Sequence, residues 1–185
     1  MKSRITAAIF AGGESSRFGS AKANALIDGE EFIVRIARNL NLMGVEEILV
    51  VGGPQGDAKK IGARFVEDEI AKSGPFGALL SALHVCGSDI LLTMPCDVPF
   101  IDAHSCLEIA NINSAFDVRV ATSEPPSTPQ WLCSAWRMSC ISHLENSFSK
   151  GERAIHRAVV GLNVEFVELS TELLRNVNTI EEMDN

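Results

Sequence analysis

The stretch Arg4–Lys22, RITAAIFAGGESSRFGSAK, joins a short apolar run to a segment that offers almost nothing to a hydrophobic core. The run Arg4–Phe10 is apolar and partly β-branched, which predicts a buried strand. The residues that follow, 11–22, contain three glycines, two adjacent serines, one arginine and one lysine. A connection of this kind indicates either a ligand-binding loop or a solvated loop whose glycines serve only turns.

The polar groups of this loop suit a polyphosphate. Gly12 and Gly13 can present successive backbone N–H groups to one anion, because no Cβ blocks its approach. Hydroxyl donors and positive charge follow in the same loop, at Ser15, Ser16, Arg17 and Lys22. Two familiar phosphate motifs are excluded, since neither GxxxxGK[ST] nor GxGxxG occurs in the chain.

Outward from this stretch, apolar runs that predict strands alternate with helical patterns. The expected strands are Arg4–Phe10, Glu47–Val51, Arg64–Val66, Asp89–Met94, Asp117–Ala121, Trp131–Trp136 and Val164–Glu168. The expected helices are Phe32–Met43, Asp57–Ala63, Pro75–Cys86, His104–Asn111, Met138–Phe148 and Glu152–Val159, with a last one capped near Asn178. This order predicts an α/β fold of three layers, Rossmann-like, with a mostly parallel, mixed central sheet. We expect one domain over residues 1–185, with the proline-rich residues 122–130 as an inserted flap.

Charge and cysteine content restrict the class of protein. A net charge of −8 argues against a nucleic-acid binder, so the cations for an anionic ligand must be concentrated locally. No apolar stretch approaches the ~20 residues that a membrane span needs, and we expect no membrane partner. The five cysteines are odd in number and form no CxxC pair. They are expected to be reduced thiols in a cytoplasmic protein.

Asp97 is the strongest candidate for a metal ligand. It lies in Met94–Phe100, MPCDVPF, directly after the apolar strand Asp89–Met94. Ligands of parallel sheets bind beyond the carboxyl ends of the strands, where this carboxylate is expected. One carboxylate together with substrate phosphates is a usual way of holding Mg²⁺. The alternative is that Asp97 caps the following helix or fills a turn.

Two further stretches carry candidate binding groups. Gly74-Pro75 begins the expected helix Pro75–Cys86, whose first amides could face a phosphate or a base, or could form an ordinary helix start. Asn176 and Asn178 are two residues apart and share a face if the chain is extended there. Asn178 could equally be the cap of the last helix.

Taken in order, these stretches resemble the nucleotidyltransferases of molybdenum cofactor maturation. The most similar branch is the molybdenum cofactor guanylyltransferase family, also called molybdopterin-guanine dinucleotide biosynthesis protein A. That family shows LAGGxSxRMGxDK, GPLAG, CDMPF and NINTPED. This chain has FAGGESSRFGSAK at 10–22, GPFGA at 74–78, CDVPF at 96–100 and NVNTIEE at 176–182.

The resemblance implies a Rossmann-like nucleotidyltransferase that requires Mg²⁺ and moves GMP from GTP to the phosphate of molybdopterin, releasing pyrophosphate. GTP and molybdopterin are then its small-molecule partners, and transient protein partners in cofactor delivery remain open. Together with the residue chemistry, it assigns nucleotide binding to Ala11, Gly12, Gly13, Ser15, Lys22, Asp68, Gly74 and Asp97. Catalytic roles fall to Arg17, Lys22 and Asp97, the metal to Asp97, and the acceptor to Asn176 and Asn178.

Departures from the family pattern keep other activities open. Ala21 stands where the family usually has Asp, Glu31 where it has Pro, and residues 128–136 match only loosely. Phe10 and Phe18 replace Leu and Met, which leaves packing intact. The alternatives are cytidylyl transfer to the same cofactor, nucleotide transfer to another small phosphate or sugar phosphate, and a catalytically silent nucleotide-binding homologue.

Overall fold

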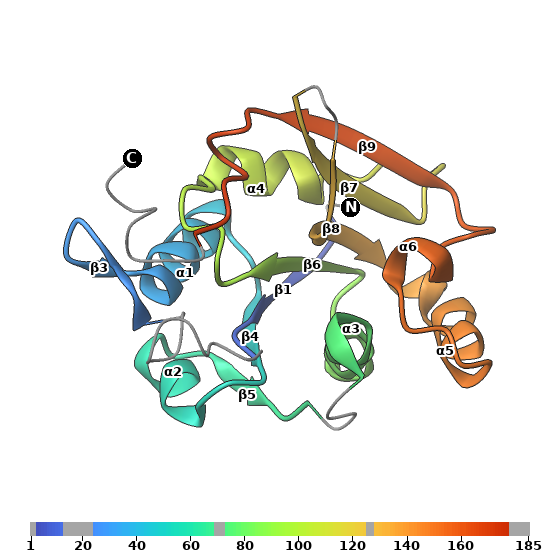
Figure 1. Ribbon diagram of the computed structural model, residues 1–185, viewed down its shortest axis with the longest axis horizontal. Helices are drawn as coiled ribbons and strands as arrows, with labels where there is room; N and C mark the ends of the chain where they lie inside the picture. The colour runs from blue at the N-terminus through green and yellow to red at the C-terminus, as the bar shows by residue number, and fades with distance from the viewer. Residues whose placement is uncertain (1–2, 13–23, 69–72, 125–127, 178–185) are drawn as a thin grey trace.

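The computed structural model describes residues 3–12, 24–68, 73–124 and 128–177 as a three-layer α/β structure (Figure 1). Its strands are β1 (Ile5–Phe10), β2 (Leu26–Ile27), β3 (Glu30–Glu31), β4 (Glu47–Val51), β5 (Arg64–Val66), β6 (Ile90–Pro95), β7 (Val118–Ser123), β8 (Pro129–Arg137) and β9 (Val164–Leu169). Its helices are α1 (Phe32–Met43), α2 (Gln55–Lys60), α3 (Gly74–Val85), α4 (Ala103–Ala110), α5 (Ile141–Ser149) and α6 (Ile155–Ala158). No helix in this described part of the chain is long and apolar enough to cross a membrane.

The central sheet has seven strands in the order β5-β4-β1-β6-β8-β7-β9. Every neighbouring pair is parallel except those that involve β8, which runs antiparallel to both β6 and β7. The mostly parallel, mixed sheet is therefore confirmed. The chain leaves β1 toward β4 and β5 and then returns to form β6 on the other side of β1. The carboxyl ends of β1 and β6 consequently adjoin at the point where the strand order reverses, which is where such sheets bind ligands.

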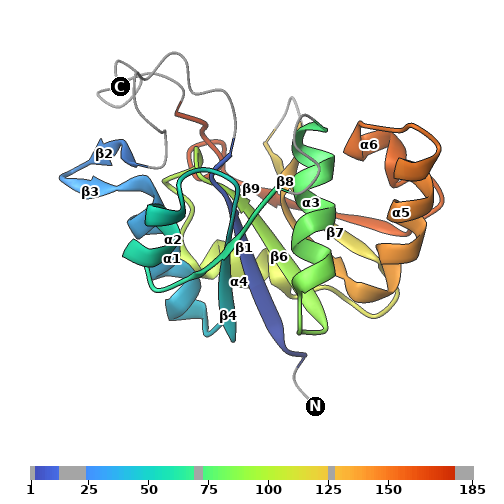
Figure 2. The ribbon, with the colours of Figure 1, turned by 90° about the horizontal axis from the view of Figure 1, so that it is seen from below.

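Helices cover both faces of the sheet (Figure 2). Successive side chains of a strand point to opposite faces, so the central strands contribute to a hydrophobic core on each face of the sheet. Ala7 and Ile9 of β1 pack with residues of α1, α2 and α4 on one face. Their neighbours Ala8 and Phe10 pack with residues of α3, α5 and α6 on the other. A strand buried on both faces needs a continuous apolar run, which explains why the sequence of β1 does not alternate with polar residues.

The expected elements differ from the observed ones mainly at their ends. Helix α2 was expected over Asp57–Ala63 but begins at Gln55 after the extended Pro54 and ends before Gly62, whose φ is +68°. The expected helix Glu152–Val159 is only α6, because the Glu152 carboxylate accepts the N–H groups of Arg153 and Ala154 ahead of the first turn. The hairpin β2–β3 was not expected, and the expected last helix lies outside the described residues.

The expectation of an inserted flap at residues 122–130 is wrong. Thr122 pairs with Pro129 at the end of the antiparallel ladder between β7 and β8, so the described residues of this segment belong to a hairpin. Four residues of the expected flap, Thr122, Ser123, Pro129 and Gln130, are therefore strand residues.

The ladder between β7 and β8 contains a large bulge. Val120 pairs with Ser134, whereas the next residue of β7, Ala121, pairs with Gln130. Residues 131–133 of β8 therefore have no partner in the ladder, and the Ser134 hydroxyl donates to the carbonyl of Trp131 at 2.7 Å. Bulges of this kind redirect side chains away from the sheet register.

Candidate active site

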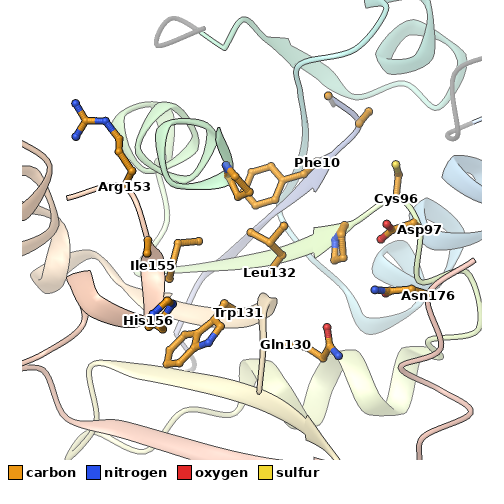
Figure 3. A pocket seen from close by; sticks show the side chains of 15 residues that line it. Phe10, Cys96, Asp97, Gln130, Trp131, Leu132, Arg153, Ile155, His156 and Asn176 are labelled. Carbon is orange, nitrogen blue, oxygen red and sulfur yellow. The ribbon is translucent and has the colours of Figure 1, made fainter. Parts of the chain in front are cut away.

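A cavity of about 500 Å³ opens at the carboxyl edge of β1 and β6 (Figure 3). This volume lies within the range of ~300–1,000 Å³ that is usual for small-molecule sites. One wall comes from the segments after β1 and β6 and from the start of α3: Phe10, Ala11, Gly12, Pro75, Pro95, Cys96 and Asp97. The opposite wall comes from β8 and the start of α6: Gln130, Trp131, Leu132, Arg153, Ala154, Ile155 and His156. Asn176 of the C-terminal segment lies beside Asp97 (Figure 3).

The loop after β1 is held by close backbone contacts with the turn after β4. The N–H of Ala11 donates to the carbonyl of Val51 at 3.1 Å. A Cβ on Gly53 would lie 2.8 Å from the carbonyl oxygen of Ala11, and a Cβ on Gly52 would lie 3.1 Å from the Cα of Gly12. Gly52 and Gly53 also have φ of +67° and +69°. Two loops can approach this closely only where glycines meet.

Asp97 lies in a turn directly after β6. The N–H of Cys96 donates to the carbonyl of Phe10 at 3.1 Å, which extends the β1–β6 pairing to the residue before Asp97. The alternative that Asp97 caps the following helix is excluded, because α4 is capped by Asp102, whose carboxylate accepts from the N–H of Ser105 at 2.7 Å. Asp97 is partly exposed and points into the cavity (Figure 3).

Asn176 is brought to Asp97 by the C-terminal segment. The N–H of Val177 donates to the carbonyl of Asp97 at 2.9 Å. The Val177 side chain is buried with Ala25, Ile27 and Phe32, and the guanidinium of Arg175 lies 4.3 Å above the Phe100 ring. These contacts on either side of Asn176 leave its own amide exposed at the cavity, near Asp97 (Figure 3).

The structure brings four predicted site residues together at the cavity: Ala11, Gly12, Asp97 and Asn176. Gly74 does not line it, but the next residue does, and the φ of +67° at Gly74 sets the start of α3 beside it. Asp68 is not among the lining residues, although its Oδ1 is buried and has no hydrogen-bond partner in the described part of the chain. The predictions on Gly13, Ser15, Arg17, Lys22 and Asn178 lie outside the described residues.

The opposite wall was missed by reasoning from the sequence. From the sequence, residues 128–136 are expected to contain the strand Trp131–Trp136 and match the family pattern only loosely, and Arg153–His156 are expected to belong to a helix; neither segment is predicted as a binding site. His156 lines the cavity although it lies in none of the quoted motifs. Trp131 and His156 lie near proline and glycine residues in the sequence and could have been singled out as candidate binding groups. The bulge that directs Trp131 to the cavity has no clear sequence signature.

The Glu152 carboxylate organises the start of α6. It accepts two hydrogen bonds from the guanidinium of Arg157, each at 2.8 Å, and the backbone N–H groups of Arg153 and Ala154 at the same distance. These donors, the Arg157 guanidinium first, lower the pKa of Glu152 to about 2. Glu152 is therefore ionised over the whole neutral range and fixes the segment that carries Ala154 to His156.

The donor set at the cavity fits a hard divalent cation with few protein ligands. Asp97 supplies a carboxylate and Asn176 an amide oxygen, which are ligand types that Mg²⁺ accepts beside water and phosphate. Within the described residues no group of three or more His, Cys, Asp or Glu side chains could hold a metal.

Burial raises the pKa of the Cys106 thiol to about 12 and that of Cys133 further, so these thiols stay protonated.

Comparison with known proteins shows which proteins this chain is similar to. A protein of Clostridium perfringens called "Probable molybdenum cofactor guanylyltransferase" is 26% identical over 97% of this chain and 94% of its own length. A protein of the same name from Pelotomaculum thermopropionicum is 31% identical over 78% of this chain and 69% of its own. The crystal structure of molybdopterin-guanine dinucleotide biosynthesis protein A from Archaeoglobus fulgidus superposes with a TM-score of 0.77, at 19% identity, over 97% and 95% of the two chains.

The family model of the MobA-like NTP transferase domain matches residues 7–164. This range runs from β1 to the start of β9 and includes the loop after β1, Asp97 and the β8 bulge. The match covers most of the chain, and the solved neighbour from Archaeoglobus fulgidus shares the overall fold. The chain thus belongs to the MobA-like NTP transferase family, a family of nucleotidyltransferases.

Proposed function

We propose that this protein transfers GMP from GTP to the terminal phosphate of molybdopterin, with Mg²⁺ bound and pyrophosphate released. The observation that carries the proposal is the two-walled cavity, in which Ala11 and Gly12 adjoin Asp97 and Asn176. A nucleotidyl transfer needs two ligands side by side, and the walls of this cavity offer different chemistry to each. The names of the relatives supply the choice of guanine and of the molybdenum cofactor.

The wall at β1 and β6 suits the triphosphate. The glycine contact between the loops after β1 and β4 leaves Gly12 exposed, with no side chain to hold an anion away from its backbone. The start of α3 at Pro75 adds a helix N-terminus to the same wall. We assign the neighbouring Gly13, Ser15, Arg17 and Lys22 to the same triphosphate, Asp68 and Gly74 to the nucleotide, and Asn178 to the acceptor.

The reaction needs no strong general base. A phosphate monoester is already an anion at neutral pH, so its oxygen can attack the α-phosphorus of GTP as pyrophosphate leaves. Asp97 and Asn176 would hold the magnesium ion. When bound, Mg²⁺ supplies neutralisation of negative charge on the phosphate oxygens. The protein then contributes positioning of the two phosphates, which can account for most of the rate enhancement of such transfers.

The test measures pyrophosphate release by the purified protein with molybdopterin, Mg²⁺ and each of GTP, CTP, ATP and UTP. We expect release with GTP, dependent on both molybdopterin and Mg²⁺. Release that is faster with CTP would replace the guanylyl assignment by a cytidylyl one. Tight binding of GTP without any release would instead indicate the silent homologue.

A further inference from the structure

Trp131 occupies the cavity because the β8 bulge removes it from the sheet register. The ladder skips residues 131–133, and the hydrogen bond from the Ser134 hydroxyl holds the Trp131 carbonyl. The indole packs on one side against the core beneath α3 and α5, yet remains partly exposed and lines the cavity. Trp136, on the same strand, is fully buried. The strand thus presents one tryptophan to the core and the other to the cavity.

The indole of Trp131 is supported from outside. The Phe166 ring of β9 meets it edge to face, with centroids 6.3 Å apart and planes at 77°. Phe166 itself is 52% exposed, so this pair is not a core contact. Figure 3 shows Trp131 beneath Leu132 and Ile155, with His156 and Gln130 on either side. A supported aromatic face with an apolar surround and polar groups at its edge is typical of a site for a flat ring.

This half of the cavity is poor in positive charge. Arg153 is the one Arg or Lys among the described residues that line the cavity. Its guanidinium lies 3.8 Å above the Phe148 ring and donates to the carbonyls of Phe148 and Glu152. Figure 3 shows its side chain extending away from Trp131. The surroundings of Trp131 therefore favour an uncharged part of a ligand, with phosphates lying toward Asp97.

We infer that Trp131, supported by Phe166, stacks on the planar pterin ring of the acceptor, with the Gln130 amide available to the heteroatoms at the ring edge. The identity of the ring as a pterin rests on the proposed function. The inference assigns the recognition of the acceptor to the wall at β8 and α6, where none of the family motifs lies. Gln130 can donate and accept hydrogen bonds at once, as a ring with neighbouring N–H and C=O groups requires.

The experiment uses neopterin monophosphate as the probe and the full-length protein. Binding is followed by calorimetry and by quenching of tryptophan fluorescence. Stacking on one aromatic side chain corresponds to about 5- to 150-fold in affinity, and we expect Trp131→Leu to weaken the probe by that factor. Trp131→Phe, which keeps an aromatic face, should stay within about threefold of the unmodified protein. Ribose 5-phosphate, which has the phosphate without a flat ring, should bind equally to all three proteins.

The affinity for GTP with Mg²⁺ separates this inference from the proposed function. Unchanged GTP affinity in Trp131→Leu, with loss of the pterin probe and of most quenching, would support a pterin platform. Equal binding of the probe by Trp131→Leu and the unmodified protein would overturn it, as would failure of the unmodified protein to bind the probe. Loss of GTP affinity instead would reassign Trp131 to the guanine base. Pyrophosphate release with GTP tests the proposed function independently of all these outcomes.

Discussion

The two walls of the cavity are built by different means. The wall at β1 and β6 is shaped mainly by backbone, through glycine contacts and strand pairing that continues to Cys96, and it carries the Asp97 carboxylate. The wall at β8 and α6 is made of side chains, and its shape comes from a bulge and from the Glu152 network. The first kind of wall leaves a motif in the sequence because only glycine and a fixed carboxylate serve there. The second kind leaves little, since many side chains can line a cavity.

The largest effect on stability is expected at Trp136, the tryptophan of β8 that is buried in the core and does not line the cavity. Trp136→Ala should lower the free energy of unfolding by about 3–5 kcal/mol, because the side chain is fully buried and its Nε1–H donates to the Thr93 hydroxyl. Trp131→Ala should lower it by only about 1–2 kcal/mol, since part of that indole is exposed. Urea denaturation measures both. Equal losses would show that Trp131 is a core residue.

The substitution Asp97→Ala tests whether the carboxylate in the wall at β1 and β6 is needed for activity. We expect pyrophosphate release to fall by more than ~100-fold, because the charge stabilisation that a bound metal supplies is worth a few kcal/mol. Asp102→Ala is a matched control that removes the helix-capping carboxylate a few residues further on. It should lower stability by ~1 kcal/mol and leave the rate nearly unchanged. A turnover of Asp97→Ala close to that of the unmodified protein would reject the role of Asp97.

Gly53→Ala tests whether close backbone contact shapes the first wall. The added Cβ would lie 2.8 Å from the Ala11 carbonyl oxygen at a φ of +69°, so we expect a loss of about 1–3 kcal/mol in stability. Displacement of the loop after β1 should also weaken GTP binding. Gly56→Ala in α2 is the control, because a Cβ there meets nothing within 4 Å. It should stabilise the protein by about 0.5–1 kcal/mol.

The smallest effect is expected for Glu152, whose contribution to the stability of the protein depends on pH below the neutral range. The folded-state pKa of Glu152 is about 2, below its ordinary value of 4.5, because the Arg157 guanidinium and two backbone N–H groups bind the ionised form. Its contribution to stability is therefore complete above pH 4.5 and is lost as the pH falls toward 2. Glu152→Gln should flatten the pH dependence of the urea midpoint in that window. A variant curve parallel to that of the unmodified protein would contradict this linkage.

The element pattern of the chain was predictable because it depends on local periodicity. Helix α1 and strands β4 and β5 were predicted with the bounds that the structure has. The start of α6 could not be predicted in this way, since it depends on a carboxylate that accepts neighbouring N–H groups. The sequence of residues 122–130 predicts an insertion, because a proline-rich stretch does not show which flanking strands pair with each other.

The amino-acid sequence by itself determined the strand and helix order, and with it the edge of the sheet to which Gly12 and Asp97 belong. Continuous apolar strands must be covered on both faces, and parallel strands bring their carboxyl ends together. Only the tertiary structure decided that Gly53 meets Ala11, that Val177 binds the Asp97 carbonyl, and that Trp131 leaves the ladder for the cavity. These contacts join residues far apart in the chain, and strand register and loop approach depend on the packing of the whole sheet rather than on local propensity.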